Sequence, residues 1–241
     1  MKNITLIRVS AFALISIFLS GCFGNQIKPE IKKQINTTEV QVIIKQPEIY
    51  GSVVRNQTGG AFGILGAIAA ENSKEERMKR NAVAIKPVVT AMKGYKVKSL
   101  AQRAYDEGLR QVGWMKPGKV KLVNRELPDS ERYTITRNSK ADAVLFVEVD
   151  YRLNDTFKAI EIESRAYLYR EIHKEPGINP EVVYRNFHTF KWELPNNADG
   201  LYDHEEIAKK WSEQKAALLK EKIKEGLDIQ AKQLAAALLK S

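Results

Sequence analysis

Cysteine is nearly absent from this chain, since Cys22 is the single cysteine among 241 residues. An intrachain disulfide is therefore excluded, whatever the redox state of the compartment. Histidine is also scarce, and no two of His173, His188 and His204 stand at the spacing of metal ligands. We therefore expect neither a bound metal nor a cofactor.

Sequence signatures of catalysis are missing as well. The chain has no G-x-S-x-G, no H-E-x-x-H and no S-x-x-K motif with its partners. Paired carboxylates offer one route to acid–base chemistry on sugars, because Glu161 and Glu163 share a face of a predicted strand and Glu148 and Asp150 share a face of its neighbour. Alternating charges are also typical of the wet face of a sheet, so we predict a protein that is not an enzyme.

Acidic residues are outnumbered by basic ones, and the net charge is +10 with a pI near 9.5. Candidate partners for this charge are nucleic acid, anionic lipid head groups, cell-wall polymers and acidic proteins. A solvated, lysine-rich surface explains the charge equally well.

A long apolar run is also lacking. The apolar stretch Val9–Leu19 is shorter than the roughly 20 residues that a transmembrane helix needs. Lys2 and Arg8 precede it, and the small residues of "SG" follow it. A basic start, a short apolar segment and small residues before a cut are the parts of a secretory signal.

The end of this signal, "LSGC" at residues 19–22, resembles the lipobox of bacterial lipoproteins. The resemblance implies cleavage between Gly21 and Cys22, a diacylglycerol thioether on Cys22 and, in many bacteria, acylation of the new amino group. One acyl chain anchors a protein only marginally, whereas two or three hold it almost permanently. A free cysteine behind an uncleaved anchor is the alternative.

The residue after the lipobox bears on the choice of membrane. In lipoproteins of enterobacterial type, an Asp after the cysteine favours retention in the inner membrane, and this chain has Phe23. The resemblance therefore implies the outer membrane, facing the periplasm, in a Gram-negative cell. An envelope address also argues against nucleic acid as a partner.

An uncharged, glycine-rich segment, "TGGAFGILGAIAA", occupies residues 58–70. It is a small-residue helix that packs on another helix or dips into a membrane, or a phosphate-binding loop, or a plain loop. The phosphate interpretation lacks both the Lys-Ser/Thr ending and the G-x-G-x-x-G order, and 13 residues are too few to span a bilayer. The candidate contacts for a partner or for lipid are Gly59, Gly60, Phe62, Gly63 and Gly66.

Capping signals and hydrophobic periodicity predict the helices. Ser-x-x-Glu at 73–76 and Ser-x-x-Gln at 99–102 match capping boxes, and "PVVTAMKG" predicts a short helix between Pro87 and Gly94. An amphipathic helix begins at about residue 203 and continues to the end, with Gly226 as the expected weak point. Unbroken, its ~35 residues would reach about 50 Å, longer than a small sheet is wide.

Strand signals fill the middle of the chain. The three longest strands are joined by short loops, so an antiparallel meander is expected. The predicted strands span 39–56 (one or two strands), 119–123, 133–136, 143–153, 157–172 and 181–194.

The fold class is therefore α+β, with an antiparallel sheet, helices on one face and a long C-terminal amphipathic helix. The predicted organisation is a signal peptide at 1–21, a polar and mobile tether at 22–38, and a single α+β domain at 39–241. The order of these parts faintly resembles small envelope auxiliary lipoproteins of the curli-secretion and transport-auxiliary types.

These features predict a membrane-anchored envelope lipoprotein that acts as a non-enzymatic binding or assembly factor. Its partners would be membrane lipid, through Cys22, and an envelope protein. A cell-wall glycan-active enzyme or glycan-binding protein is one alternative, because of the basic charge and the aromatic side chains between Tyr167 and Trp192. A lipid-handling protein with an apolar cleft between the sheet and the final helix is another.

Overall fold

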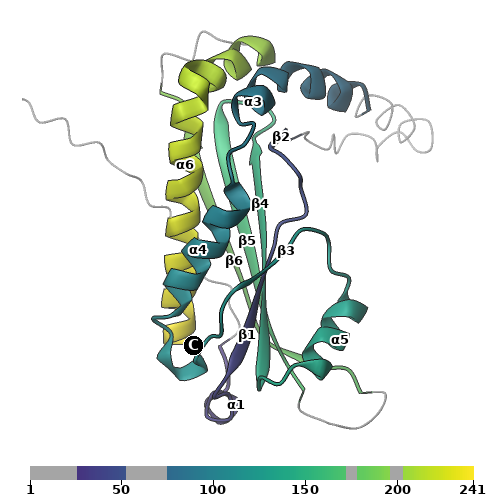
Figure 1. The fold of residues 1–241 in the computed structure, drawn as a ribbon, viewed down its shortest axis with the longest axis vertical. Helices are drawn as coiled ribbons and strands as arrows, with labels where there is room; N and C mark the ends of the chain where they lie inside the picture. The colour runs from purple at the N-terminus through teal and green to yellow at the C-terminus, as the bar shows by residue number, and fades with distance from the viewer. Residues whose placement is uncertain (1–25, 53–74, 172–177, 196–202) are drawn as a thin grey trace, which may run out of the picture.

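The structure is a computed structural model that describes residues 26–52, 75–171, 178–195 and 203–241. A six-stranded sheet forms its centre, in the order β3-β1-β4-β5-β6 with β2 beside β4 (Figure 1). The strands are β1 (Thr38–Ile43), β2 (Tyr50–Gly51), β3 (Lys121–Val123), β4 (Ala143–Leu153), β5 (Ala159–Arg170) and β6 (Glu181–Glu193).

Helices pack on this sheet, and the predicted α+β class is confirmed. A helical stretch at 75–84 directly precedes α3. The other helices are α1 (Pro29–Lys32), α3 (Lys86–Ala91), α4 (Val97–Leu109), the 3-10 turn η2 (Gly113–Met115), α5 (Asp129–Asn138) and α6 (His204–Lys240).

The sheet is mixed rather than wholly antiparallel. Strands β4, β5 and β6 form the expected antiparallel meander, with Ile162 opposite both Tyr151 and Phe190. Strand β1, however, runs parallel to β3 and to β4. Parallel neighbours need a long crossover connection, which the path through α3 and α4 supplies between β1 and β3.

One face of the sheet is dry and lies beneath α4 and α6 (Figure 1). Alternate residues of β4 point to it, including Leu145, Val147 and Val149, all at most 3% exposed. Gly226 does not interrupt α6 but lets the helix approach this face closely. A Cβ atom there would lie 2.5 Å from Cδ1 of Phe190.

Helix α6 changes direction at Glu213–Ala216 instead, about ten residues before the expected weak point. Gln214, Lys215 and Ala216 have φ values of 50°, 59° and 59°, outside the helical region. In Figure 1 the first part of α6 lies across one end of the molecule and the second part runs along the sheet. The bend keeps both parts of this long helix in contact with one small body.

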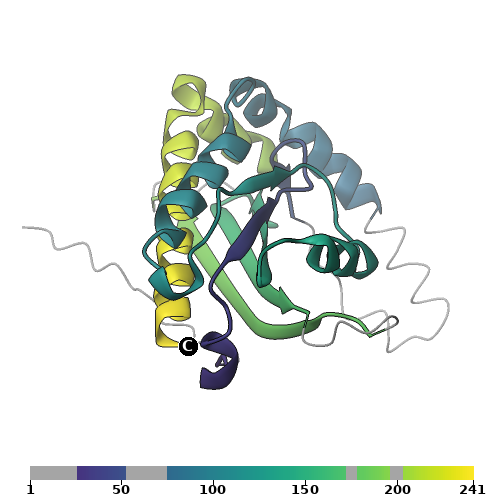
Figure 2. The same ribbon diagram turned by 60° about the horizontal axis from the view of Figure 1, so that its bottom comes forward.

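The opposite face of the sheet is covered at one end by α5, so helices lie on both faces rather than one (Figure 2). Residues 133–136, predicted as a strand because of their β-branched side chains, lie within this helix. Tyr133 and Ile135 pack on a small second core that includes Phe146 of β4. Contact with the sheet overrides the local strand preference, and Asp129 in the first turn suits the positive end of the helix dipole.

The described part of the predicted tether belongs to the packed body. Ile27 and Ile35 are 2% and 1% exposed, on either side of α1. One carboxylate oxygen of Asp142 accepts the backbone N–H groups of Asn36 (2.9 Å) and Thr37 (3.0 Å). The polar composition of this segment therefore did not reveal that it contains two core residues and a backbone held by hydrogen bonds.

The sequence signals for the boundaries of α3 and α4 had different outcomes. Pro87 stands in the first turn of α3, and Gly94 follows with φ +80°, as predicted. Helix α4 instead begins at Val97, before the expected capping box at 99–102, and the amide of Gln102 donates to the Val120 carbonyl at 2.7 Å. The other predicted box, at 73–76, begins outside the described residues.

Candidate functional site

A hollow of about 640 Å³, here called the charged groove, lies on the sheet face opposite α6. Its floor consists of side chains of β4 and β5 that point away from the dry core. Its walls come from β1, β2, β6, α5 and the loops beside them. It is lined by five basic side chains (Lys45, Arg132, Arg152, Arg165 and Arg185), five acidic ones (Glu126, Asp129, Glu148, Asp150 and Glu163) and three tyrosines (Tyr50, Tyr167 and Tyr169).

Arg152 lies at the centre of an ion-pair network on this floor. Its guanidinium lies 2.7 Å from Asp150 and 3.1 Å from Glu161, and it also contacts Glu163. Pairing of β4 with β5 sets this arrangement, because Arg152 stands opposite Glu161 and Asp150 stands opposite Glu163. Burial alone would lower the pKa of Arg152, but its hydrogen bonds to Glu163 and Asp150 outweigh burial and raise it.

A second ion pair joins α5 to the sheet. The guanidinium of Arg132 contacts the carboxylate of Glu148, and its Nε donates to the carbonyl of Leu127 at 2.9 Å. The same guanidinium lies 5.4 Å from the ring of Tyr167 and 5.9 Å from that of Phe146. The Arg132 side chain is 8% exposed and closes one end of the groove.

The four carboxylates singled out in the sequence are therefore brought together, and a guanidinium faces each of them. An adjacent cation stabilises the charged form of a carboxylate, whereas acid catalysis on a sugar needs a carboxyl that holds a proton. The hydroxyl of Tyr50 donates to Asp150 at 2.7 Å, and burial followed by this Asp raises the pKa of the phenol. The floor is thus a charge-paired surface.

The rim of the groove carries cations with weak partners or none. Lys45 and Arg185 are exposed, and neither forms an ion pair within the part of the chain that the structure describes. Arg165 is 3.7 Å from Glu163, and its guanidinium lies 5.8 Å from the ring of Phe187, which is 51% exposed. The groove therefore offers positive charge beside an exposed aromatic ring.

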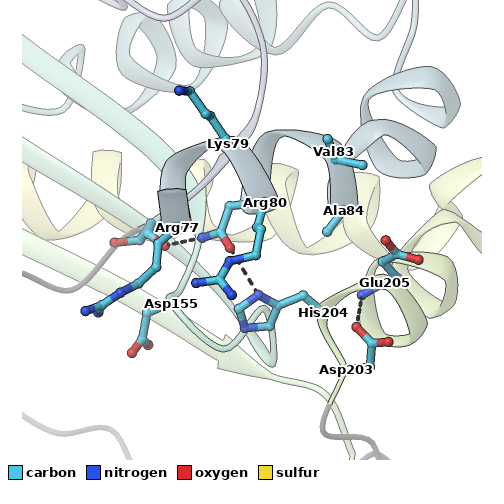
Figure 3. Close-up of a pocket in the computed structure, with 11 residues that line it drawn as sticks. Arg77, Lys79, Arg80, Val83, Ala84, Asp155, Asp203, His204 and Glu205 are labelled. Atoms are coloured by element: carbon cyan, nitrogen blue, oxygen red, sulfur yellow. Dashed lines mark hydrogen bonds between the residues drawn. The ribbon is translucent and has the colours of Figure 1, made fainter. Parts of the chain in front are cut away.

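A second hollow, of about 900 Å³, lies between the helical stretch 75–84, the turn after β4 and the start of α6 (Figure 3). We call it the end hollow. His204 lies beside it, with Nδ1 3.1 Å from Oδ1 of Asn81 and its ring stacked on Phe157 at 4.7 Å. The charged side chains around it are Arg77, Lys79, Arg80, Asp155, Asp203 and Glu205.

Phe157 anchors this end of the molecule to the core. It is fully buried with φ +61°, and its carbonyl accepts a hydrogen bond from Nε1 of Trp211 at 2.7 Å. Its ring packs so closely on Gly51 that a Cβ atom there would lie 2.1 Å from Cε1. The polar groups of Asn81 are also engaged, since its amide donates to the Ser52 carbonyl at 2.9 Å.

The remaining predicted site residues lie outside the described residues. They are Gly21, Cys22, Gly59, Gly60, Phe62, Gly63 and Gly66. The points where the described chain leaves and resumes around residues 53–74 can nevertheless be placed. Ser52 and Asn81 are joined by the hydrogen bond above, and both line the end hollow.

The histidines show no shared site. His188 lies between β6 and α6, where burial lowers its pKa, and the fully buried Gln230 donates to its backbone carbonyl at 3.3 Å. His173 lies outside the described residues. Within the described ranges, no three His, Cys, Asp or Glu side chains are placed to hold a metal. None of the helices described there has the length and apolarity to cross a membrane.

No protein-family model matches this chain, and no curated protein matches it either. Among solved structures, the PelC dodecamer from Paraburkholderia phytofirmans is similar, with 11% identity, a TM-score of 0.31, and coverage of 85% of this chain and 96% of that one. The hypothetical protein CT253 from Chlamydia trachomatis is 8% identical, with a TM-score of 0.27 and coverage of 83% and 99%. These likenesses are too distant to carry function, which is argued below from the residues.

Proposed function

We propose that this protein is a lipid-anchored envelope protein that binds a partner without catalysing a reaction. The observation that carries the proposal is the lipobox-like "LSGC" directly before a packed body. Ile27, five residues after Cys22, is already buried in the core. An extended chain spans at most about 3.6 Å per residue, so the body would lie within about 18 Å of the anchor.

The two ends of the molecule would then have different surroundings. The anchor end consists of α1, η2 and the last turn of α6, and Lys32 of α1 donates to the Ser241 carbonyl at 2.7 Å. After its bend, α6 runs about 36 Å away from the far end, where the end hollow lies. Ser52, the last described residue before the glycine-rich segment, lies at this far end, and we propose a partner rather than the anchoring bilayer as the contact of that segment.

The charged groove supports binding as the activity. The carboxylates on its floor are paired with Arg132 and Arg152, whereas Lys45 and Arg185 at the rim form no ion pair within the described residues. A partner with exposed carboxylates would complement these cations, and an interface needs such charge complementarity for specificity and for fast association. We therefore propose an acidic envelope protein as the partner.

Site-specific photocrosslinking in intact cells tests this function. A photoreactive residue at Phe62 or Arg185 should give protein adducts, and one at Glu221 on the outer side of α6 serves as the matched control. Adducts with lipid alone at the first two positions, or the same adducts at all three, would contradict a protein partner.

A glycan ligand is the second candidate, and the groove gives it some support through Tyr50, Tyr167 and the ring of Phe187 beside cations. Incubation of the mature chain with purified peptidoglycan separates the candidates. Soluble fragments that disappear in Glu161→Gln or Glu163→Gln would indicate an enzyme, and retention without cleavage would indicate a glycan-binding protein.

The lipid-handling alternative receives no support from the described residues. Its apolar cleft was expected between the sheet and the final helix, but there the side chains of Ile162 and Phe190 pack directly on Gly226. The charged groove exposes mainly polar surface, and Arg77, Arg80 and Asp155 are among the charged side chains that line the end hollow. Lipid that copurifies with the unlipidated chain would revive this alternative.

A further inference from the structure

The anchor end is one continuous surface formed by three segments that lie far apart in the sequence. Lys32 of α1 lies 5.1 Å over the ring of Trp114 in η2, and Nε1 of Trp114 donates to the Leu238 carbonyl of α6 at 3.0 Å. The loop after η2 is attached to the start of β1, because Gly118 N–H donates to the Thr38 carbonyl at 2.8 Å. Figures 1 and 2 both show α1 beside the C-terminal end of α6.

This surface is strongly basic. Segments 26–34, 113–119 and 236–240 contain six lysines and one acidic residue, Glu30. Five of the lysines are exposed, and none of these five forms an ion pair within the described residues. These five lysines, here called the basic patch, are Lys28, Lys33, Lys116, Lys119 and Lys240.

Apolar side chains lie among these cations. Leu239 is 50% exposed, although it stands next to Lys240 in the last turn of α6. Trp114 is partly exposed, with its ring between the apolar end of α6 and the ammonium group of Lys32. Lysines around an exposed leucine and a tryptophan are typical of surfaces at the boundary between water and lipid head groups.

We infer that the basic patch lies against anionic head groups of the same bilayer that holds Cys22, and so fixes the orientation of the body. This inference depends on the proposed lipid anchor. Two observations select a bilayer as the occupant: the patch has the complementary charge, and the chain leaves it toward Cys22 with only three residues between Gln26 and the anchor. Each lysine near an anionic membrane strengthens binding up to about fivefold.

Orientation in vesicles tests the inference on the lipidated chain. Lipidation blocks the thiol of Cys22, so one introduced cysteine can carry a fluorophore without a second label. The label is placed at Gln34 on the anchor end or at Val83, which is exposed at the far end. Vesicles contain phosphatidylethanolamine with or without phosphatidylglycerol, together with a lipid that carries a quencher on its head group.

We expect strong quenching at Gln34→Cys, weak quenching at Val83→Cys, and a larger difference when phosphatidylglycerol is present. Replacing four patch lysines by Gln (Lys28, Lys33, Lys119 and Lys240) should reduce that difference. The matched control replaces four exposed lysines elsewhere: Lys86, Lys93, Lys96 and Lys209. Equal quenching at the two labels, or equal effects of the two sets of substitutions, would overturn the inference.

The unlipidated Cys22→Ser chain separates this inference from the proposed anchor. It should sediment with phosphatidylglycerol vesicles at low salt and be released at high salt, because surface electrostatic attraction is screened. Loss of this binding in the patch variant but not in the control variant would show that the patch binds anionic head groups, whether or not Cys22 carries a lipid. Absence of binding, or binding that both variants retain, counts against the patch and leaves the anchor to be judged by its own test.

Discussion

The two faces of the sheet carry different kinds of side chain. The face beneath α6 is apolar, and Trp211, Ile223 and Leu227 of the helix are at most 1% exposed there. The face that forms the charged groove holds ion pairs around Arg152 and Arg132 in place of an apolar core. The same strands supply both faces by alternation, so a change of one position along β4 or β5 exchanges an apolar environment for a charged one.

The largest expected loss of stability comes from the dry face. Trp211→Ala removes a buried ring and its hydrogen bond to the Phe157 carbonyl, so the free energy of unfolding should fall by about 3–5 kcal/mol. Urea denaturation of the Cys22→Ser mature chain measures this value. Trp211→Phe keeps most of the apolar volume and should cost clearly less; equal losses would show that this core tolerates a cavity.

The groove should give a smaller loss that depends on salt. Arg152→Leu leaves Asp150, Glu161 and Glu163 without their shared cation, so the free energy of unfolding should fall by about 2 kcal/mol at pH 7. The three carboxylates then repel one another, and salt screens this repulsion. The loss should therefore shrink as the salt concentration rises, and a loss that is independent of salt would contradict the network.

The apolar face of the sheet also packs closely on α6 at Gly226. Gly226→Ala places a methyl group against Phe190 and Ile162, at a cost of about 1–3 kcal/mol that the better helix propensity of alanine partly offsets. Combining it with Phe190→Leu should recover part of the loss. If the effects of the two changes are simply additive, α6 and β6 are not in direct contact at this position.

His188 should produce the smallest change in stability. Burial lowers its folded-state pKa below the ordinary value near 6.5, so the unfolded chain binds the proton more readily. This contribution to stability is present above that ordinary value and is lost as the pH falls through it. Urea denaturation between pH 7 and pH 5 should show this decline, and His188→Gln should flatten it; an unchanged profile would assign the pH dependence to other groups.

Local sequence patterns predicted the three strands of the antiparallel meander, β4, β5 and β6. Alternation placed β4 at Ala143–Leu153 with its correct inward residues, and it placed β5 and β6 to within about two residues. The parallel position of β1 could not be predicted in the same way, because it depends on a crossover through α3 and α4. Helix α5 was missed because Tyr133 and Ile135, which favour strands locally, pack on the small second core, and a local propensity does not register this contact.

Alternation along the strands also predicted the carboxylates of the candidate site, but it did not predict every cation. Alternation brought Glu148, Asp150, Glu161 and Glu163 to one face, as the structure confirms. Their partner Arg152 stood on the same face of the same strand, so the ion pairs could have been inferred from the alternation. The contribution of Arg132 could not, since it reaches the groove from a helix whose position depends on tertiary packing.

Mass spectrometry of the chain extracted from membranes is the most direct test of the proposed lipid anchor on Cys22. We predict that the N-terminal peptide begins at Cys22 and carries the mass of a diacylglycerol thioether, with or without a further acyl group on its amine. We also predict that the Cys22→Ser chain leaves the membrane fraction at high salt. An unmodified chain that begins at Met1, or a Cys22→Ser chain that stays with membranes at high salt, would contradict it.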